Sequence, residues 1–183
     1  MLGLRVQTAG RRRSGIRVMD IVVVGGGLAG CEAAWQLAER GFRVRLFEMR
    51  PFVRTPAHST ALLAEVVCSN SFGGEGDTGA AGILKAELEL GRSLILSCAH
   101  KTRVPAGGAL AVDRDRFAEL VSASVESHPN VELVREEVTA VPKETTILAT
   151  GPLTSSAMAK SLGELIGESY LSFFDAVAPI VTR

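Results

Sequence analysis

The chain has 183 residues, of which 46% are hydrophobic and 22% charged, so we expect one domain with a sizeable core, or one domain and part of another. Twenty basic and 20 acidic side chains cancel, but five of the arginines lie within residues 1–19, which contain no acid. The remainder therefore lacks the basic surplus of typical nucleic-acid-binding domains, and it has no apolar run long enough to span a membrane.

Residues 1–18 are rich in arginine and have no hydrophobic period. We interpret them as a disordered basic extension, or as sequence upstream of a true start at Met19. A transit peptide has a similar composition, but Met19 directly precedes the first expected strand, which favours the other two interpretations.

The three cysteines, Cys31, Cys68 and Cys98, are widely spaced and form no CxxC pair. This spacing is typical of a reducing compartment and argues against a disulfide framework or a zinc site. The chain also has no HExxH motif, so we expect no metal site. A reducing compartment is consistent with the cytoplasmic location that we expect.

The most informative stretch is a glycine-rich turn between a strand and a helix. Residues 21–24 are apolar on both faces, as a central parallel strand requires. The pattern Gly25-x-Gly27-x-x-Gly30 follows, and it opens a helix predicted over residues 28–40. In a dinucleotide-binding turn, the first glycine permits the tight bend, the second lets the backbone approach a pyrophosphate, and the third lets the helix pack on the strand.

A carboxylate lies where such a fold places the group that binds a ribose. The second predicted strand, residues 44–47, ends at Glu48, 18 residues after Gly30. Its carboxylate would accept hydrogen bonds from ribose hydroxyls and repel a 2′-phosphate. The alternative is a glycine-rich loop in an unrelated α/β protein, with Glu48 as a solvated strand end.

The middle of the chain contains a long irregular segment. Prolines predict a loop over residues 49–71, with a short helix around residues 62–67. Residues 72–77 are glycine-rich and predict a flexible turn. Apolar residues then recur at helical spacing over residues 83–98, and Gly91 divides or kinks that helix.

The rest of the chain alternates between strands and helices. We predict a turn and short strand within 103–112, followed by a helix over 114–127 that Asp113 caps. Strands are predicted at 131–134, 138–141 and 146–149, and the last of them should be buried. A helix over 154–166 and a strand-like end at 173–181 follow. This order predicts an α/β fold with a doubly wound, Rossmann-like parallel sheet and an inserted segment. The turn Thr150-Gly151 would then lie at the carboxyl edge, where ligands bind.

Cys68 is the cysteine with the most open interpretation. It ends an apolar run and precedes Ser69, Asn70 and Ser71, so it could place a thiolate beside a ligand, or it could be a buried small hydrophobe. Cys31 and Cys98 lie on predicted helices; Cys31 is interpreted as a packing residue and Cys98 as an inert thiol. His58 is on the long loop and could titrate near neutral pH, although a surface position is the default.

Six blocks of the chain resemble the folate- and FAD-dependent tRNA uracil-5-methyltransferases, bacterial flavoproteins related to the glucose-inhibited division protein A family. The resemblance covers nearly all of residues 19–183, and its most specific blocks are Cys-Ser-Asn-Ser at 68–71 and Pro-Ala-Gly-Gly-Ala-Leu-Ala-Val-Asp-Arg at 105–114. The other blocks lie at 25–30, 46–51, 55–58 and 148–153.

This resemblance implies a reaction and a set of partners. Family members transfer a one-carbon unit from 5,10-methylenetetrahydrofolate to C5 of a uridine in the T-loop of tRNA, with reduced FAD as reductant and NAD(P)H to regenerate it. It also implies that Cys68 lies beside the flavin, and that the nucleophilic cysteine lies beyond Arg183. The implied cofactor-binding residues are Gly25, Gly26, Gly27, Leu28, Ala29, Gly30, Glu48, Met49, Arg50 and Gly151.

The resemblance further implies that residues 19–170 are an incomplete, C-terminally truncated FAD-binding domain and that residues 171–183 begin an inserted second domain. Two other functions stay open. One is a related flavoprotein, either the enzyme that modifies the tRNA wobble uridine or a general FAD oxidoreductase, against which the block at 105–114 argues. The other is a truncated, non-catalytic nucleotide-binding module.

Overall fold

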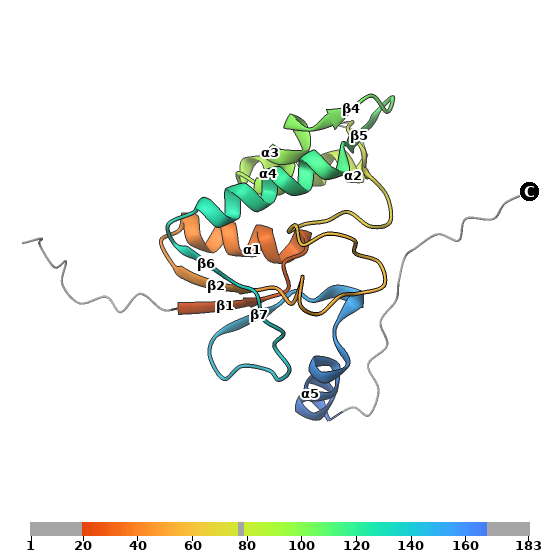
Figure 1. The fold of residues 1–183 in the computed structure, drawn as a ribbon. Helices are drawn as coiled ribbons and strands as arrows, with labels where there is room; N and C mark the ends of the chain where they lie inside the picture. The colour runs from red at the N-terminus through yellow and green to blue at the C-terminus, as the bar shows by residue number, and fades with distance from the viewer. Residues whose placement is uncertain (1–19, 77–78, 168–183) are drawn as a thin grey trace, which may run out of the picture.

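The computed structural model describes residues 20–76 and 79–167, which are built around a four-stranded parallel sheet in the order β6-β2-β1-β7 (Figure 1). The expected basic extension at 1–18, the strand-like end at 173–181 and the start of a second domain at 171–183 lie outside the described residues. The sheet strands are β1 (Asp20–Val24), β2 (Arg43–Phe47), β6 (Val131–Val134) and β7 (Thr146–Leu148).

Helices cover both faces of this sheet, which confirms the predicted doubly wound α/β fold. Figure 1 shows α1 (Leu28–Glu39), α3 (Leu94–Lys101) and α4 (Arg114–Ser127) on one face of the sheet and α5 (Ser156–Ile166) on the other.

The predicted insertion lies between β2 and β6. It contains a second, three-stranded antiparallel sheet in the order β3-β5-β4, beside which α2 lies (Figure 1). Its elements are β3 (Ser71–Gly74), α2 (Ala80–Leu90), β4 (Arg103–Val104) and β5 (Ala109–Val112). As the sequence predicts, the helical stretch is divided near Gly91, after which Ser93 caps α3 by accepting a hydrogen bond from the Leu96 N–H.

The core lies between the sheet and the three-helix face. Val23 and Leu46 point to that face from adjacent strands and are fully buried. Phe117, on the apolar stripe that predicted α4, is fully buried among them, and Asp113 caps α4 by accepting from the Arg116 N–H at 3.1 Å, as predicted. A smaller cluster on the opposite face joins Val22 and Val24 to Met158 of α5.

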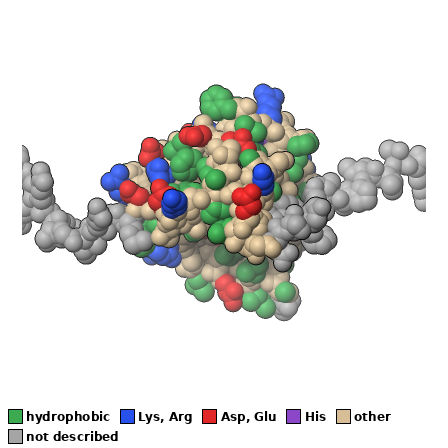
Figure 2. Space-filling view, turned by 90° about the horizontal axis from the view of Figure 1, so that it is seen from below, with side chains coloured by type: hydrophobic (Ala, Val, Ile, Leu, Met, Phe, Trp, Pro, Cys, Tyr) green, Lys and Arg blue, Asp and Glu red, His purple; other side chains and the backbone are tan. Residues whose placement is uncertain are grey.

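The opposite face is less completely covered. Figure 2 views the molecule from this side and shows hydrophobic side chains among charged ones of both signs. Strand β7 is an edge strand of the described sheet, and Ile147 is 38% exposed. The prediction of a buried strand here was therefore wrong. A run of apolar residues predicts a strand, but it does not tell whether the strand has neighbours on both sides and helices on both faces.

Three other local predictions were wrong. Residues 62–67 are not helical, residues 138–141 form no strand, and residues 72–74 of the predicted flexible turn belong to strand β3. Contacts distant in sequence explain each difference. The N–H of Leu63 bonds to the Ser122 hydroxyl instead of a helical carbonyl, Val138 and Val141 pack on the cluster around Met158, and β5 supplies the pairing partner of β3.

Candidate functional site

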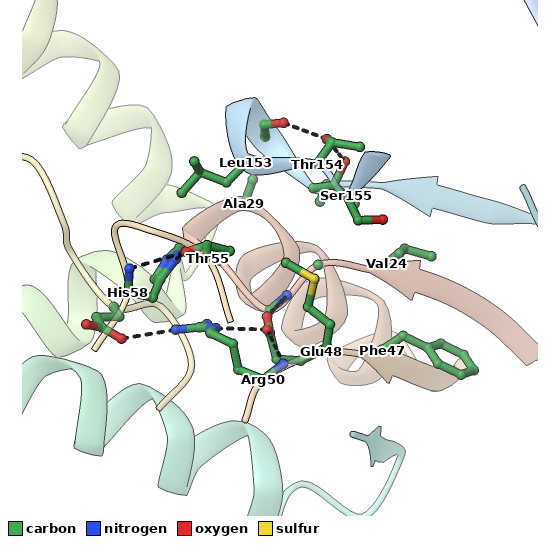
Figure 3. A pocket seen from close by; sticks show the side chains of 18 of the residues that line it. Val24, Ala29, Phe47, Glu48, Arg50, Thr55, His58, Leu153, Thr154 and Ser155 are labelled. Carbon is green, nitrogen blue, oxygen red and sulfur yellow. Dashed lines mark hydrogen bonds and ion pairs between the residues drawn. The ribbon is translucent and has the colours of Figure 1, made fainter. Parts of the chain in front are cut away.

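The register of the parallel strands brings three chain segments together at one edge. Val24 pairs with Phe47 and with Leu148, so the glycine turn, Glu48 and the turn after Ala149 follow adjacent strand ends. They line a cleft of about 300 Å³, a size suited to a small-molecule ligand (Figure 3). The carboxyl edge of a parallel sheet is where ligands bind in such folds.

The cleft contains almost all of the cofactor-binding residues expected from the sequence. It is lined by Gly25, Gly26, Gly27, Leu28, Ala29, Glu48, Met49, Arg50, Cys68 and Gly151. Gly30 is not part of this lining, because it packs the helix against the strand end. His58, which was expected by default on the surface, also lines the cleft.

The three motif glycines have different surroundings, and two of them leave no room for a side chain. Gly25 has a φ of +105°, and a Cβ there would lie 2.6 Å from the Ala149 carbonyl oxygen. A Cβ on Gly30 would lie 1.8 Å from the Gly25 carbonyl oxygen, so α1 can pack on the turn only without a side chain at this position. A Cβ on Gly27 would meet nothing within 4 Å, so Gly27 leaves open space above the turn.

That open space lies at the N-terminus of α1. Gly27 is the N-cap residue, and no side chain caps the first N–H groups within the described part of the chain. Uncapped N–H groups and the partial positive charge of the helix end favour an anion such as a pyrophosphate.

Glu48 is 6% exposed and its carboxylate is held by the backbone of the turn. Oε2 accepts from the Gly26 N–H at 2.8 Å, and Oε1 accepts from the backbone N–H and the Nε–H of Arg50 at 3.0 and 2.8 Å. Burial raises the pKa of Glu48, but the hydrogen bonds and the charge of Arg50 outweigh burial and lower it below 4.5. The carboxylate is therefore ionised at neutral pH.

Arg50 links Glu48 to a second carboxylate that sequence analysis missed. The Arg50 side chain is 3% exposed, and its Nη1 donates to Glu65 Oε2 at 3.1 Å (Figure 3). Glu65 also accepts from the backbone N–H and hydroxyl groups of Ser59 and Thr60. Burial raises the pKa of Glu65, but these hydrogen bonds lower it to about 2. Glu65 is the single acidic residue in the apolar run 61–67, and this was the signal in the sequence that could have indicated a buried, paired carboxylate.

His58 and Gly151, which lie outside the regular strands, also line the cleft. His58 faces Thr55, with 2.6 Å between His58 Nδ1 and Thr55 Oγ1 (Figure 3). Burial and the nearby charge of Arg50 lower the pKa of His58 below 6.5, so its imidazole is neutral at pH 7. In the segment after β7, Gly151 has a φ of +62° and open space beside its Cα, and Thr154 Oγ1 donates to the Gly151 carbonyl at 2.7 Å.

The three cysteines lie in different environments. Cys68 is exposed and lines the cleft, whereas Cys31 and Cys98 are buried as the sequence predicts. Burial and the negative charge of Glu48 raise the pKa of Cys31 to about 12, and burial raises that of Cys98.

We expect the three thiols to differ in their rate of alkylation because of these environments. At pH 8, one thiol per chain should react rapidly with iodoacetamide, and peptide mass spectrometry should locate it at Cys68, because thiolate fraction and access both control the rate. All three thiols should react once the protein is unfolded in urea. Rapid labelling of Cys31 in the native protein would contradict this assignment of environments.

Within 20–76 and 79–167, no three His, Cys, Asp or Glu side chains are grouped so that they could hold a metal ion. Nor does any helix in those ranges have the length and apolarity to cross a membrane.

The sheet order and the glycine turn with its cleft define a nucleotide-binding α/β protein. Comparison with known families is more specific: the model described as glucose inhibited division protein A matches residues 20–183, and the chain belongs to this family. Among solved structures, the open form of NikD, an unusual amino acid oxidase, has the same fold, with a TM-score of 0.50 and 18% identity over 81% of this chain and 55% of that chain.

Curated relatives are much closer in sequence. The chain is 56% identical over 165 residues to methylenetetrahydrofolate–tRNA-(uracil-5-)-methyltransferase TrmFO of Anoxybacillus flavithermus, covering 90% of this chain and 38% of that protein. It is 55% identical over 162 residues to the protein of the same name from Aquifex aeolicus, covering 88% and 36%. The chain thus spans little more than a third of the length of these relatives.

Proposed function

We propose that the cleft binds FAD, with the pyrophosphate over Gly27 at the N-terminus of α1 and the adenosine ribose at Glu48. The observation that carries this proposal is the open space at Gly27, next to two glycines that tolerate no side chain. A pyrophosphate fits that space and the uncapped helix end.

The state of Glu48 supports the ribose assignment. A carboxylate offers about four acceptor sites, two on each oxygen. Two hydrogen bonds occupy Oε1 and one occupies Oε2, so one acceptor site on Oε2 can receive a ribose hydroxyl. The negative charge at this position favours a ribose without a 2′-phosphate.

Cys68 and Gly151, which both line the cleft, are proposed to lie near the flavin ring. When bound, the flavin would supply the redox chemistry of the reaction. The residues of this chain would bind and orient it, with Gly151 allowing close approach of the backbone. Cys68 would contact the ring without attacking the substrate base.

We further propose that the protein acts in 5-methyluridine formation in the T-loop of tRNA, with 5,10-methylenetetrahydrofolate as carbon donor and NAD(P)H as the source of electrons, in the cytoplasm. The support is the 56% identity to a relative named for this activity. The tRNA and folate contacts are not assigned to residues of this chain.

The FAD proposal predicts saturable binding by the protein. Titration of the flavin-free protein with FAD should quench flavin fluorescence with 1:1 stoichiometry, because one cleft of suitable size holds one pyrophosphate. FMN, which lacks the adenosine and the pyrophosphate, should bind at least about tenfold more weakly, since hydrogen bonds to charged groups contribute about 1.5–3 kcal/mol each. Equal binding of FMN and FAD would contradict the placement of the nucleotide.

The activity proposal is tested separately on tRNA that lacks 5-methyluridine. With labelled methylenetetrahydrofolate, FAD and NADPH, label should enter a T-loop uridine. Label at the wobble uridine would favour the related modification enzyme. FAD binding without incorporation anywhere would identify a nucleotide-binding module without this activity.

A further inference from the structure

Glu65 belongs to a chain of hydrogen bonds that ends at the glycine turn. Its carboxylate accepts from Arg50 Nη1, Arg50 Nε donates to Glu48 Oε1, and Glu48 Oε2 accepts from the Gly26 N–H. All three charged side chains are largely buried, with Glu65 at 13% exposure. The loop before β3 is therefore connected to the proposed ribose site through two ion pairs.

Glu65 itself is held firmly. It accepts four hydrogen bonds from Ser59 and Thr60, at 2.7 to 3.1 Å, besides the one from Arg50. Because five donors converge on it, its carboxylate presents a fixed acceptor to Arg50 Nη1. The Arg50 guanidinium is planar, so an anchored Nη1 also fixes the direction of its Nε–H toward Glu48.

The orientation of Arg50 decides which acceptor of Glu48 stays free. Arg50 occupies both acceptor sites of Oε1 through its backbone N–H and Nε–H. Oε2 has one remaining site beside the Gly26 N–H. A guanidinium without a second anchor could rotate to Oε2, where its N–H groups would compete with a ribose hydroxyl for the remaining acceptor site.

We propose that Glu65 is a positioning residue for nucleotide recognition: it locks Arg50 onto one oxygen of Glu48 and thereby reserves the other oxygen for a ribose hydroxyl. This inference rests on the proposed binding of an adenine nucleotide in the cleft. Glu65 acts through Arg50 and Glu48 and is not assigned a contact with the ligand.

The loop has other attachments that do not depend on Glu65. The Ala64 N–H donates to the Gly26 carbonyl at 2.8 Å, the Leu63 N–H donates to the Ser122 hydroxyl at 2.8 Å, and Arg135 Nη1 donates to the Ala61 carbonyl at 2.7 Å. Leu63 is fully buried. The backbone near Glu65 therefore stays attached when the side chain is shortened, and the positioning role can be tested in a folded protein.

The test compares two probes, ADP and 2′,3′-dideoxy-ADP, by isothermal titration calorimetry on the full chain. Only ADP offers hydroxyl donors to Glu48, so the ratio of the two dissociation constants measures the ribose contact. The unmodified protein should prefer ADP by about tenfold or more, as one hydrogen bond to a charged group would give. In Glu65→Ala, that preference should fall to about twofold or less, while the affinity for dideoxy-ADP changes little.

Two further variants complete the design. Glu75→Ala is the matched control, because Glu75 is also a partly buried glutamate paired with an arginine, Arg103, but lies outside the cleft lining. It should keep the tenfold preference. Arg50→Lys should lose the preference as Glu65→Ala does, since one ammonium cannot replace the Nε–H and Nη1 contacts together. If Glu65→Ala fails to fold, the Arg50→Lys variant serves as the test in its place.

The outcomes separate this inference from the proposed function. A preference for ADP that survives in Glu65→Ala or Arg50→Lys would overturn the positioning role and leave nucleotide binding intact. Equal weakening of both probes would also overturn it, because that result indicates a merely structural role. Failure of the unmodified protein to bind ADP or FAD would overturn the proposed function and this inference with it.

Discussion

Substituting serine at two glycines of the same turn should have opposite effects. Gly30→Ser should destabilise the protein by more than about 3 kcal/mol, the usual upper range for overpacking, because its Cβ would lie 1.8 Å from the Gly25 carbonyl oxygen. Gly27→Ser should leave stability unchanged or raise it by a few tenths of a kcal/mol. Gly27 is an N-cap with φ −77° and ψ −171°, a conformation that serine adopts readily and in which it caps a helix.

Gly27→Ser should nevertheless reduce FAD affinity by about 100-fold or more. The new hydroxyl would occupy the space left open at Gly27 and take helix N–H groups that the pyrophosphate needs, at about 1.5–3 kcal/mol for each hydrogen bond to a charged group. Thermal unfolding by circular dichroism without ligand, together with FAD titration, measures both effects. A Gly27→Ser variant with undiminished FAD affinity would place the pyrophosphate elsewhere.

The sequence predicts those parts of the site whose residues are close together in the chain. The strand, the glycine turn and α1 are consecutive in the chain, so periodicity and residue type fix their order and contacts. Glu48 could be placed for the same reason, because it directly follows β2, which pairs with β1. The roles that set Gly25, Gly27 and Gly30 apart likewise follow from backbone geometry common to such turns.

The other wall of the cleft depends on partners far away in sequence. Leu63 is bonded to Ser122, which is 59 positions away, and Arg135 holds the Ala61 carbonyl from 74 positions away. These contacts turn the predicted short helix at 62–67 into an irregular segment, in which Ala64 has a φ of +53°. Local periodicity carries no information about such contacts, so neither the loop path nor the role of Glu65 could be predicted.

The predicted strand at 138–141 illustrates the same limit. A short strand was expected here, but Val138 and Val141 pack against the second cluster, and the Val141 N–H donates to the Ser161 hydroxyl of α5. The conformation of residues 138–141 therefore depends on the surface against which they pack, and part of that surface is α5, which comes later in the sequence.

Replacing Arg50 by methionine should be among the most destabilising single changes in the protein. The variant leaves the carboxylates of Glu48 and Glu65 without their shared cation, at side-chain exposures of 7% and 13%. Removing one partner of a buried ion pair typically costs about 3–5 kcal/mol, because the remaining charge is left uncompensated. Arg103→Met is the control: Arg103 is 46% exposed and pairs with Glu75, so its loss should cost no more than about 1 kcal/mol. Urea unfolding at pH 7 measures both.

The pH dependence of the Arg50→Met defect distinguishes charge from packing. In the unmodified protein the pKa values of Glu48 and Glu65 are lowered on folding, that of Glu65 from 4.5 to about 2, so their stabilisation is present above about pH 4.5 and is lost as the pH falls toward 2. Without Arg50, burial should instead raise the pKa of Glu48, and protonation in acid should then relieve the defect. The two stability curves should therefore converge as the pH falls from about 4.5 toward 2. A difference that stays constant over this range would mean that Arg50 stabilises the cleft by packing, and that the ionic link from Glu65 to Glu48 contributes little to the folded state.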